Sequence, residues 1–379
     1  MRTYRELFAV TEFRTIFAGT LGGVAGGTMA MLAVSALVYA ETGSPFLAAV
    51  AYLLGFLPQA LGALLLGGWA DRLPARALLS WWTLVRAVVI GLMAAGVVPV
   101  WFMAALGVGD AVAGAARQAL TADLLPGEAY VLGRSTLNLA VGGMQIAGYG
   151  VAGLLMLAVG PQAALASAAA VELVMVPLYR FGLRRRRPRN RAPQRTFRFF
   201  APGLLLTQWV PSGLIVGAEA LFVPLAGESA GLLFMAAAGG MLAGDLVVGR
   251  WTDARSRLAL GPWLYALLGL PYLAFFLEPG LVAAVALVGV ASFGYAGQLG
   301  TQERYLAAVP ERARGQALGL AASGMQSSQA LAAAGTGTLA EFVPVPVAIA
   351  LAGLASLTAS VALARHIVRP VTPPGARPG

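Results

Sequence analysis

The sequence predicts an all-α integral membrane protein whose twelve transmembrane helices form two pseudo-symmetric six-helix bundles. Three observations support this fold class. Of the 379 residues, 59% are hydrophobic and 11% are charged, a composition typical of helices that face lipid. The apolar residues form runs long enough to cross a hydrocarbon core of about 30 Å. A short charged loop occurs once in each half of the chain, which indicates two halves built on one plan.

The predicted spans are separated by polar or proline-containing turns, of which 41–45, 99 and 160–161 are the clearest in the first half. In order, the expected spans are 16–40, 46–68, 77–98, 100–120, 135–159, 162–182, 201–225, 229–249, 259–277, 280–302, 315–340 and 344–364. The arginine-rich stretch 183–199 cannot cross lipid, so we expect it to be a solvated linker that touches anionic lipid. The expected division is an N-terminal half at 1–182, this linker, a C-terminal half at 200–367 and a tail at 368–379.

The distribution of charge predicts the orientation in the membrane. Alternate loops carry the acids Glu41, Glu228, Glu278 and Glu341, whereas the other loops and both ends hold nearly all the arginines. Arginine-rich loops stay inside, so both termini should be cytoplasmic. The net charge of +10 is explained in the same way, and we expect no nucleic-acid partner.

Two residue types are absent, and their absence limits the chemistry. The chain has no cysteine, and all 26 basic residues are arginines. Without lysine there is no phosphate-binding loop of the Walker type and no Schiff base, so ATP-driven pumping by this chain is not expected. We expect no cofactor, no metal and no enzymatic activity.

The repeated loop has a specific pattern in its first copy, where Gly67 is followed by Asp71, Arg72 and Arg76. Small residues allow helices to approach closely, and an aspartate can lie near the positive end of a helix from the other half. These four residues resemble the G-x-x-x-D-R-x-x-[RK] loop between helices two and three of the major facilitator superfamily. The resemblance implies a conformational gate, in which Arg117 is the expected partner of Asp71.

The second copy of the loop contains Asp253 and Arg255 and resembles the superfamily loop between helices eight and nine. Further stretches resemble the bacterial branch that includes the enterobactin exporter and multidrug efflux proteins, among them 42–45 and 115–120. This resemblance implies a small-molecule exporter driven by the proton gradient. The sequence departs from proton-coupled relatives at Asp110, where many carry arginine, and at 148–153, which lacks the proline of the antiporter pattern.

Several charges fall inside the predicted spans. Arg86 and Asp110 each lie about ten residues into adjacent spans, hence about 15 Å deep, and we expect them to form an ion pair. That pair is either static or the site where Asp110 exchanges a proton or meets a cationic substrate. Glu172, near mid-depth without an evident partner in sequence, and Glu219, nearer the outer end of its span, are further candidates for proton coupling.

Uncharged polar residues give candidates for a substrate cavity. Gln145 and Gln326 each follow Gly-Met, at almost the interval that separates the two charged loops, and both are expected at mid-depth. They either face one cavity or form hydrogen bonds between helices. If the superfamily architecture holds, Trp209, Tyr295 and Gln298 lie on spans that line the pathway.

The sequence thus favours a secondary active transporter that exports a small amphipathic molecule by proton antiport with alternating access. We expect it to act as a monomer in contact with membrane lipids in the bacterial cytoplasmic membrane. An intramembrane aspartyl protease is an alternative, because residues 107–110 match the G-x-G-D pattern of such enzymes. A lipid flippase or a transport-dead sensor on the same fold is a third possibility.

Overall fold

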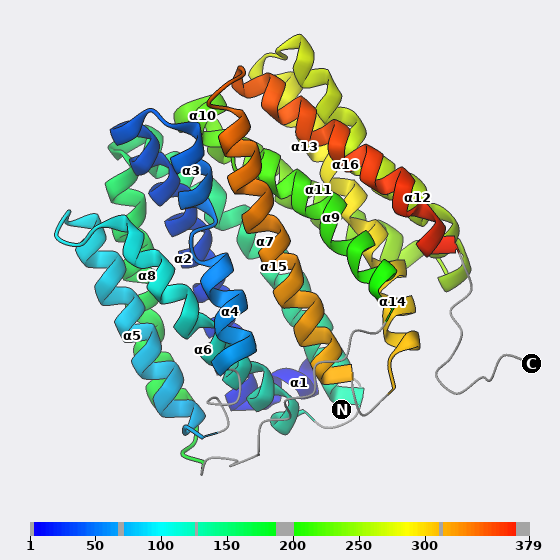
Figure 1. Cartoon of the computed structure of the whole chain (residues 1–379). Helices are drawn as coiled ribbons and strands as arrows, with labels where there is room; N and C mark the ends of the chain where they lie inside the picture. The colour runs from blue at the N-terminus through cyan, green and yellow to red at the C-terminus, as the bar shows by residue number, and fades with distance from the viewer. Residues whose placement is uncertain (1–3, 67–71, 126–127, 187–200, 311–313, 369–379) are drawn as a thin grey trace, which may run out of the picture. The chain divides into compact units, whose positions relative to one another are not determined.

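The structure is a computed structural model that describes residues 4–66, 72–125, 128–186, 201–310 and 314–368. The described residues are almost entirely helical (Figure 1). Ten segments among them are long and apolar enough to cross a membrane, and one of these, Pro202–Trp251, contains two long helices. The protein is therefore an all-helical membrane protein of about ten to twelve spans, as the sequence predicts.

The chain divides into two compact units. Unit 1 comprises residues 1–41 and 54–194. Its helices are α1 (Tyr4–Ala9), α2 (Thr11–Thr42, which ends one residue beyond the unit), α4 (Phe56–Leu66), α5 (Ala75–Ala94), α6 (Met103–Leu124), α7 (Glu128–Val159) and α8 (Pro161–Gly182).

Unit 2 comprises residues 42–53 and 195–379. Its α-helices are α3 (Pro45–Tyr52), α9 (Pro202–Glu219), α10 (Phe222–Ala226), α11 (Ala230–Trp251), α12 (Ala254–Gly269), α13 (Leu281–Phe293), α14 (Gly297–Ala308), α15 (Arg314–Leu339) and α16 (Val345–Val368). Short 3₁₀ segments include η4 (Leu270–Leu277) and η5 (Gly294–Ala296).

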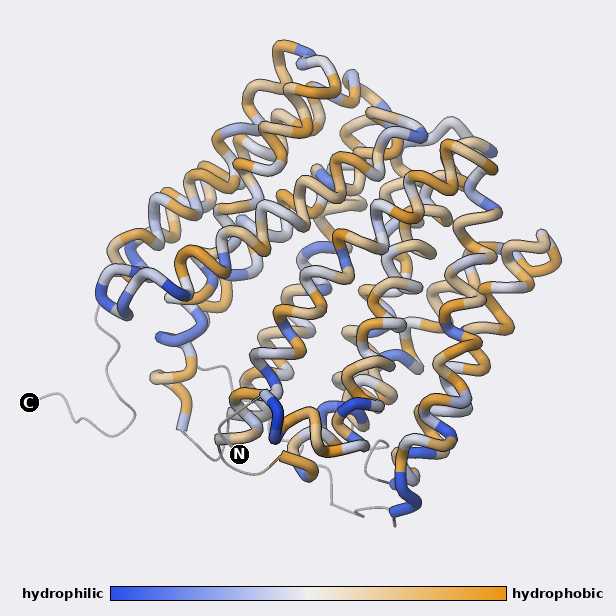
Figure 2. Tube along the Cα trace, turned by 180° about the vertical axis from the view of Figure 1, so that it is seen from behind, coloured by the Kyte–Doolittle hydropathy of each residue, from blue (hydrophilic) through white to orange (hydrophobic). Residues whose placement is uncertain are grey.

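Four predicted spans are interrupted in the structure. The span expected at 46–68 is split into α3 and α4, and those expected at 201–225, 259–277 and 280–302 are each broken by a turn or a 3₁₀ segment. Such breaks are tolerated within a membrane protein where the freed backbone groups are buried in protein. The hydrophobic pattern could not reveal them, because residues on both sides of each break are equally apolar. Figure 2 shows hydrophobic residues along most of each helix and hydrophilic residues mainly toward the helix ends.

Helix α3 belongs to unit 2 although its neighbours in sequence belong to unit 1. Ser44 caps its first turn, where Oγ accepts a hydrogen bond from the N–H of Leu47 at 3.1 Å, and proline follows at the first helical position. The Ser44 hydroxyl donates to Glu341, and the Phe46 N–H donates to the same Glu341 oxygen at 3.0 Å. Glu341 therefore fixes the start of α3 within unit 2.

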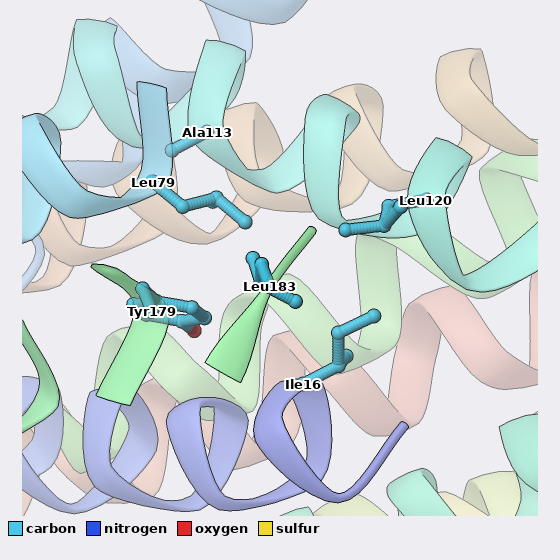
Figure 3. Close-up of a cluster of buried hydrophobic side chains, with 6 residues drawn as sticks. All are labelled: Ile16, Leu79, Ala113, Leu120, Tyr179 and Leu183. Carbon is cyan, nitrogen blue, oxygen red and sulfur yellow. The ribbon is translucent and has the colours of Figure 1, made fainter. Parts of the chain in front are cut away.

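One apolar core cluster of unit 1 lies at the end of the unit where α5 begins and α8 ends. It joins Leu79 of α5, Tyr179 of α8 and Ile16 of α2 with three residues from α6 and from the end of α8 (Figure 3). Glycines on α2 allow this packing: a Cβ at Gly19 would meet the ring of Tyr179, and one at Gly22 would meet Met175. Gly19 and Gly22 thus allow close contact between α2 and α8.

Candidate functional site

A cluster of three charged residues lies inside unit 1, where α5, α6 and α8 meet. Arg86 of α5 donates from Nε to Oε1 of Glu172 on α8 at 3.0 Å, and its Nη2 lies 2.9 Å from the same oxygen. Its Nη1 donates to Oδ2 of Asp110 on α6. The side chains of Arg86 and Glu172 are 13% and 3% exposed, and that of Asp110 is 26% exposed. We call these three residues the charge cluster.

A fourth residue orients the cluster. The indole N–H of Trp82, one helical turn before Arg86 on α5, donates to Oδ1 of Asp110 at 2.8 Å. The ring fits because residue 109 is glycine: a Cβ there would collide with the six-membered part of the Trp82 indole. Sequence analysis missed Trp82. The adjacent glycine and aspartate at 109–110 were a signal, but pairing them with a residue on another helix requires the fold.

The ion pair expected between Arg86 and Asp110 is present, so the argument from helical rise is confirmed. The sequence offered no evident partner for Glu172, and the structure supplies one, because Glu172 shares the Arg86 guanidinium. Residues 86 and 172 are far apart in sequence, and their contact depends on the packing of α5 against α8. Burying a charge without a partner costs several kcal/mol, roughly, so each carboxylate needs this arginine.

The structure places only part of the first charged loop. Gly67 and Asp71 lie outside the described residues, so the contact between Asp71 and Arg117 stays a prediction. Arg72 is exposed in the turn before α5, and Arg76 is half-buried in the first turn of that helix. Arg117 lies on α6, and its Nε is buried without a hydrogen-bond partner among the residues that the structure describes.

The second copy of the loop is fully visible. Asp253 precedes α12 and caps it, because Oδ1 accepts a hydrogen bond from the N–H of Ser256 at 2.7 Å. The side chain of Ser256, together with its N–H, holds the pKa of Asp253 below its ordinary value by hydrogen bonding to the carboxylate. Arg255 is exposed in the first turn of the same helix. In this copy the aspartate stabilises the start of its own helix.

A family model matches residues 16–297, about three quarters of the chain, and its description is Major Facilitator Superfamily. The chain belongs to the major facilitator superfamily. It is therefore a secondary transporter for small molecules and a multi-pass membrane protein. Superfamily membership also decides against the intramembrane protease considered for residues 107–110. Asp110 in that stretch pairs with Arg86.

Solved structures of several transporters show the same fold at low sequence identity. A bacterial homologue of the iron transporter ferroportin in the inward-facing state has a TM-score of 0.67 at 16% identity, over 97% of this chain and 100% of the other. The xylose transporter XylE from E. coli in an inward-open conformation gives 0.69 at 15%, over 94% and 95%. A POT family transporter in complex with a thioalcohol-conjugated peptide gives 0.70 at 12%, over 94% and 96%. No curated protein shows significant sequence similarity to the chain.

The candidate cavity residues of this superfamily member are distributed over both units. In unit 2, Trp209 on α9 donates its indole N–H to the Ala321 carbonyl of α15 at 2.9 Å, and Gln298 on α14 donates to the Ser212 hydroxyl of α9 at 2.8 Å. These two hydrogen bonds connect α9 to α15 and to α14. Tyr295 is buried in η5. Trp209 and Gln298 therefore make hydrogen bonds between helices.

The two symmetric glutamines lie in different units: Gln145 is on α7 of unit 1 and Gln326 on α15 of unit 2, and both are half-buried. Their sharing of one cavity stays a prediction. Glu219 is the last residue of α9 and is 7% exposed. It lies beside Tyr272 of η4 and pairs with no arginine in the part of the chain that the structure covers.

Proposed function

We propose that this transporter exports a small amphipathic molecule in exchange for protons, and that the charge cluster carries the proton. One observation carries the proposal: two carboxyl groups share one guanidinium inside an apolar helix bundle. With both carboxyls ionised the cluster has a net charge of about −1, and with one protonated it is neutral. The membrane interior favours the neutral form, so one proton belongs to the cluster whenever no other cation replaces it.

This exchange suits an antiporter. A cationic group on a substrate would displace the proton by neutralising the same negative charge. A change in solvent access during alternating access would instead hydrate the ionised cluster and let the proton leave to water. Asp110 is the more exposed of the two carboxyls and is the one that meets the transported species. Glu172, which is nearly fully buried, retains the guanidinium when Asp110 changes partner. Glu219 of unit 2 is the second candidate carrier, because it is buried and pairs with no arginine among the described residues.

The gate, the direction and the location complete the proposal. Asp71 meets Arg117 when the inner side is closed, and the loop with Asp253 and Arg255 is its counterpart.

The efflux direction is supported by the resemblance of 42–45 and 115–120 to exporters, and the cytoplasmic location of both termini by the arginine-rich loops. We place the protein in the bacterial cytoplasmic membrane as a functional monomer, with residues 183–199 linking two six-helix halves. Gln145, Gln326, Trp209, Tyr295 and Gln298 are proposed to contribute to the substrate cavity.

The test is transport in proteoliposomes with an imposed proton gradient, using tetraphenylphosphonium as the first probe, then a weak acid and a siderophore-like chelate. Asp110→Asn should abolish uphill movement of the probe while downhill exchange persists. Asp123→Asn makes the same chemical change at an exposed position of α6 and should transport normally. Uphill transport by Asp110→Asn at the wild-type rate would reject Asp110 as carrier. The same assay on Glu219→Gln would then decide whether unit 2 carries the proton.

Flippase activity on the same fold remains the second candidate. It predicts that a fluorescent phospholipid moves between leaflets in these proteoliposomes while the small-molecule probes do not. Movement of neither class, with the protein intact, would favour a sensor.

A further inference from the structure

A groove of about 560 Å³ lies on unit 1 where α5 begins and α8 ends. Its polar end is formed by Arg76 of α5, Arg180 in the last turn of α8 and Arg185 just after it. Its apolar wall is formed by Trp81, Leu84 and Val176. All of these residues belong to one unit, and all but Arg185 lie on α5 or α8, two helices that pack against each other. The hydrophilic end of α8 is visible in Figure 2.

The charges at this groove are not balanced by carboxylates of the residues that the structure describes. A fourth arginine, Arg186, lies 2.8 Å from Glu12, whose other oxygen accepts the Arg184 N–H. Arg76, Arg180 and Arg185 have no carboxylate partner among the described residues, and Arg76 keeps a buried Nε without an acceptor there. Three unpaired cations so close together repel one another, so an anion that bridges them would be bound favourably.

The backbone adds to this attraction. Helix α5 begins after Pro74, whose side chain cannot cap it, and no side-chain cap is present at its first turn among the described residues. The positive end of the macrodipole of a 20-residue helix therefore lies at the same end of the groove as the arginines.

The apolar side of the groove continues into the membrane. Trp81 is 68% exposed although it lies on a membrane-spanning helix. Val85, Val88 and Leu92 follow it on the same face of α5 at helical spacing, and all three are exposed. A cationic end followed by an exposed apolar stripe matches a ligand with a phosphate head and a hydrocarbon chain.

We propose that this groove binds an anionic glycerophospholipid from the surrounding membrane. The phosphate lies among Arg76, Arg180 and Arg185, and one acyl chain lies over Trp81 and along α5. A water-soluble phosphate lacks the chain that would cover Trp81. A zwitterionic lipid carries a cation of its own, which the three arginines repel.

The experiment is native mass spectrometry of the full, delipidated protein in nonionic detergent, titrated with dioleoyl phosphatidylglycerol, dioleoyl phosphatidylethanolamine or glycerol 1-phosphate. We expect phosphatidylglycerol to bind at least five-fold more tightly than phosphatidylethanolamine, and glycerol 1-phosphate not to compete. Arg180→Gln and Arg185→Gln should each weaken phosphatidylglycerol binding about five-fold. This is the change in affinity that corresponds to the binding free energy of one arginine near an anionic lipid surface. Arg250→Gln, at the exposed end of α11 in unit 2, is the matched control and should change binding less than about two-fold.

A second pair of variants tests the apolar contact. Trp81→Ala should weaken phosphatidylglycerol binding, whereas Trp263→Ala, at a similarly exposed tryptophan of unit 2, should not. Both tryptophans lie on the surface, so these variants should fold, and their thermal unfolding in detergent checks this. Equal binding of the two lipids, equal effects of Arg250→Gln and Arg180→Gln, or full competition by glycerol 1-phosphate would each overturn the proposal.

Discussion

The indole nitrogen of Trp82 lies 2.8 Å from Oδ1 of Asp110, so a neutral donor engages one oxygen of a carboxylate whose other oxygen pairs with Arg86. Both oxygens of Asp110 are thereby oriented by α5. A carboxylate held on two sides returns to one position after it gains or loses a proton. The arrangement depends on Gly109, because no larger residue leaves room for the ring of Trp82.

Replacing Gly109 by alanine should displace Trp82. We expect Gly109→Ala to lower the free energy of unfolding by about 1–3 kcal/mol, measured by thermal or denaturant unfolding in detergent. Gly114→Ala on the same helix is the control, since no atom lies within 4 Å of its added Cβ, and it should be neutral or slightly stabilising. In a Trp82→Ala background the cost of Gly109→Ala should fall below about 0.5 kcal/mol. If Gly109→Ala lowered the stability by the same amount in the Trp82→Ala background, the added methyl group would clash with a residue other than Trp82.

The charge cluster should behave as a unit of three residues. Replacing Arg86 alone by methionine leaves the buried Glu172 and the half-buried Asp110 without this cation and should cost about 3–5 kcal/mol of stability. Adding Asp110→Leu should not restore the protein, because Glu172 still lacks a partner. Only the triple variant with Glu172→Leu should recover wild-type abundance and thermal stability. Recovery in the double variant would show that Glu172 does not depend on Arg86. Loss of uphill transport in a stable triple variant would separate function from folding.

The contact between Glu341 and the start of α3 should depend on pH. Hydrogen bonds from the Ser44 hydroxyl and the Phe46 N–H lower the pKa of Glu341. A lowered pKa means that the stabilisation is complete above the pKa of an unfolded glutamate, about 4.3, and is lost as the pH falls through the folded value. The melting temperature of Glu341→Gln should therefore lie below that of wild type near neutral pH and converge with it in acid. Glu228→Gln, an exposed acid of the same unit, is the control. A difference that does not change with pH would contradict the proposed cause.

Reporter fusions test the orientation. Fusions after Arg191 and in the C-terminal tail should read cytoplasmic, and fusions near Glu41 and Glu278 should read external. An external reading after Arg191 would overturn the model of two halves joined by a cytoplasmic linker.

The sequence predicted the fold class and the pairing of two of the three residues of the charge cluster for the same reason: both depend on regular helix geometry. Arg86 and Asp110 lie on consecutive spans, so depth along each helix was enough to pair them. The contact of Trp82 with Asp110 required knowledge of which helix faces meet, and that of Glu172 with Arg86 also depends on the packing of α5 against α8, which are not consecutive spans. The hydrophobic pattern of a span does not indicate which other helix it contacts.

The breaks inside spans were also outside the reach of the sequence. Residues 46–68 read as one apolar run, yet α3 and α4 pack in different units. The start of α3 is fixed by Glu341, which follows it by roughly 300 residues and accepts hydrogen bonds from Ser44 and Phe46. Local composition could not indicate so distant a contact.

The placement of α3 means that the polypeptide cannot be divided cleanly at its basic linker. Residues 42–53 pack with unit 2, where Tyr52 stacks on Phe234 with ring centroids 4.7 Å apart, while the chain on both sides packs with unit 1. An amino-terminal fragment ending in the linker would carry a helix that belongs to the other product of the cut. The carboxy-terminal fragment would expose Phe234 and leave Glu341 without its donors. Two separately expressed halves would therefore reassemble only if α3 of the amino-terminal fragment packed against the carboxy-terminal fragment.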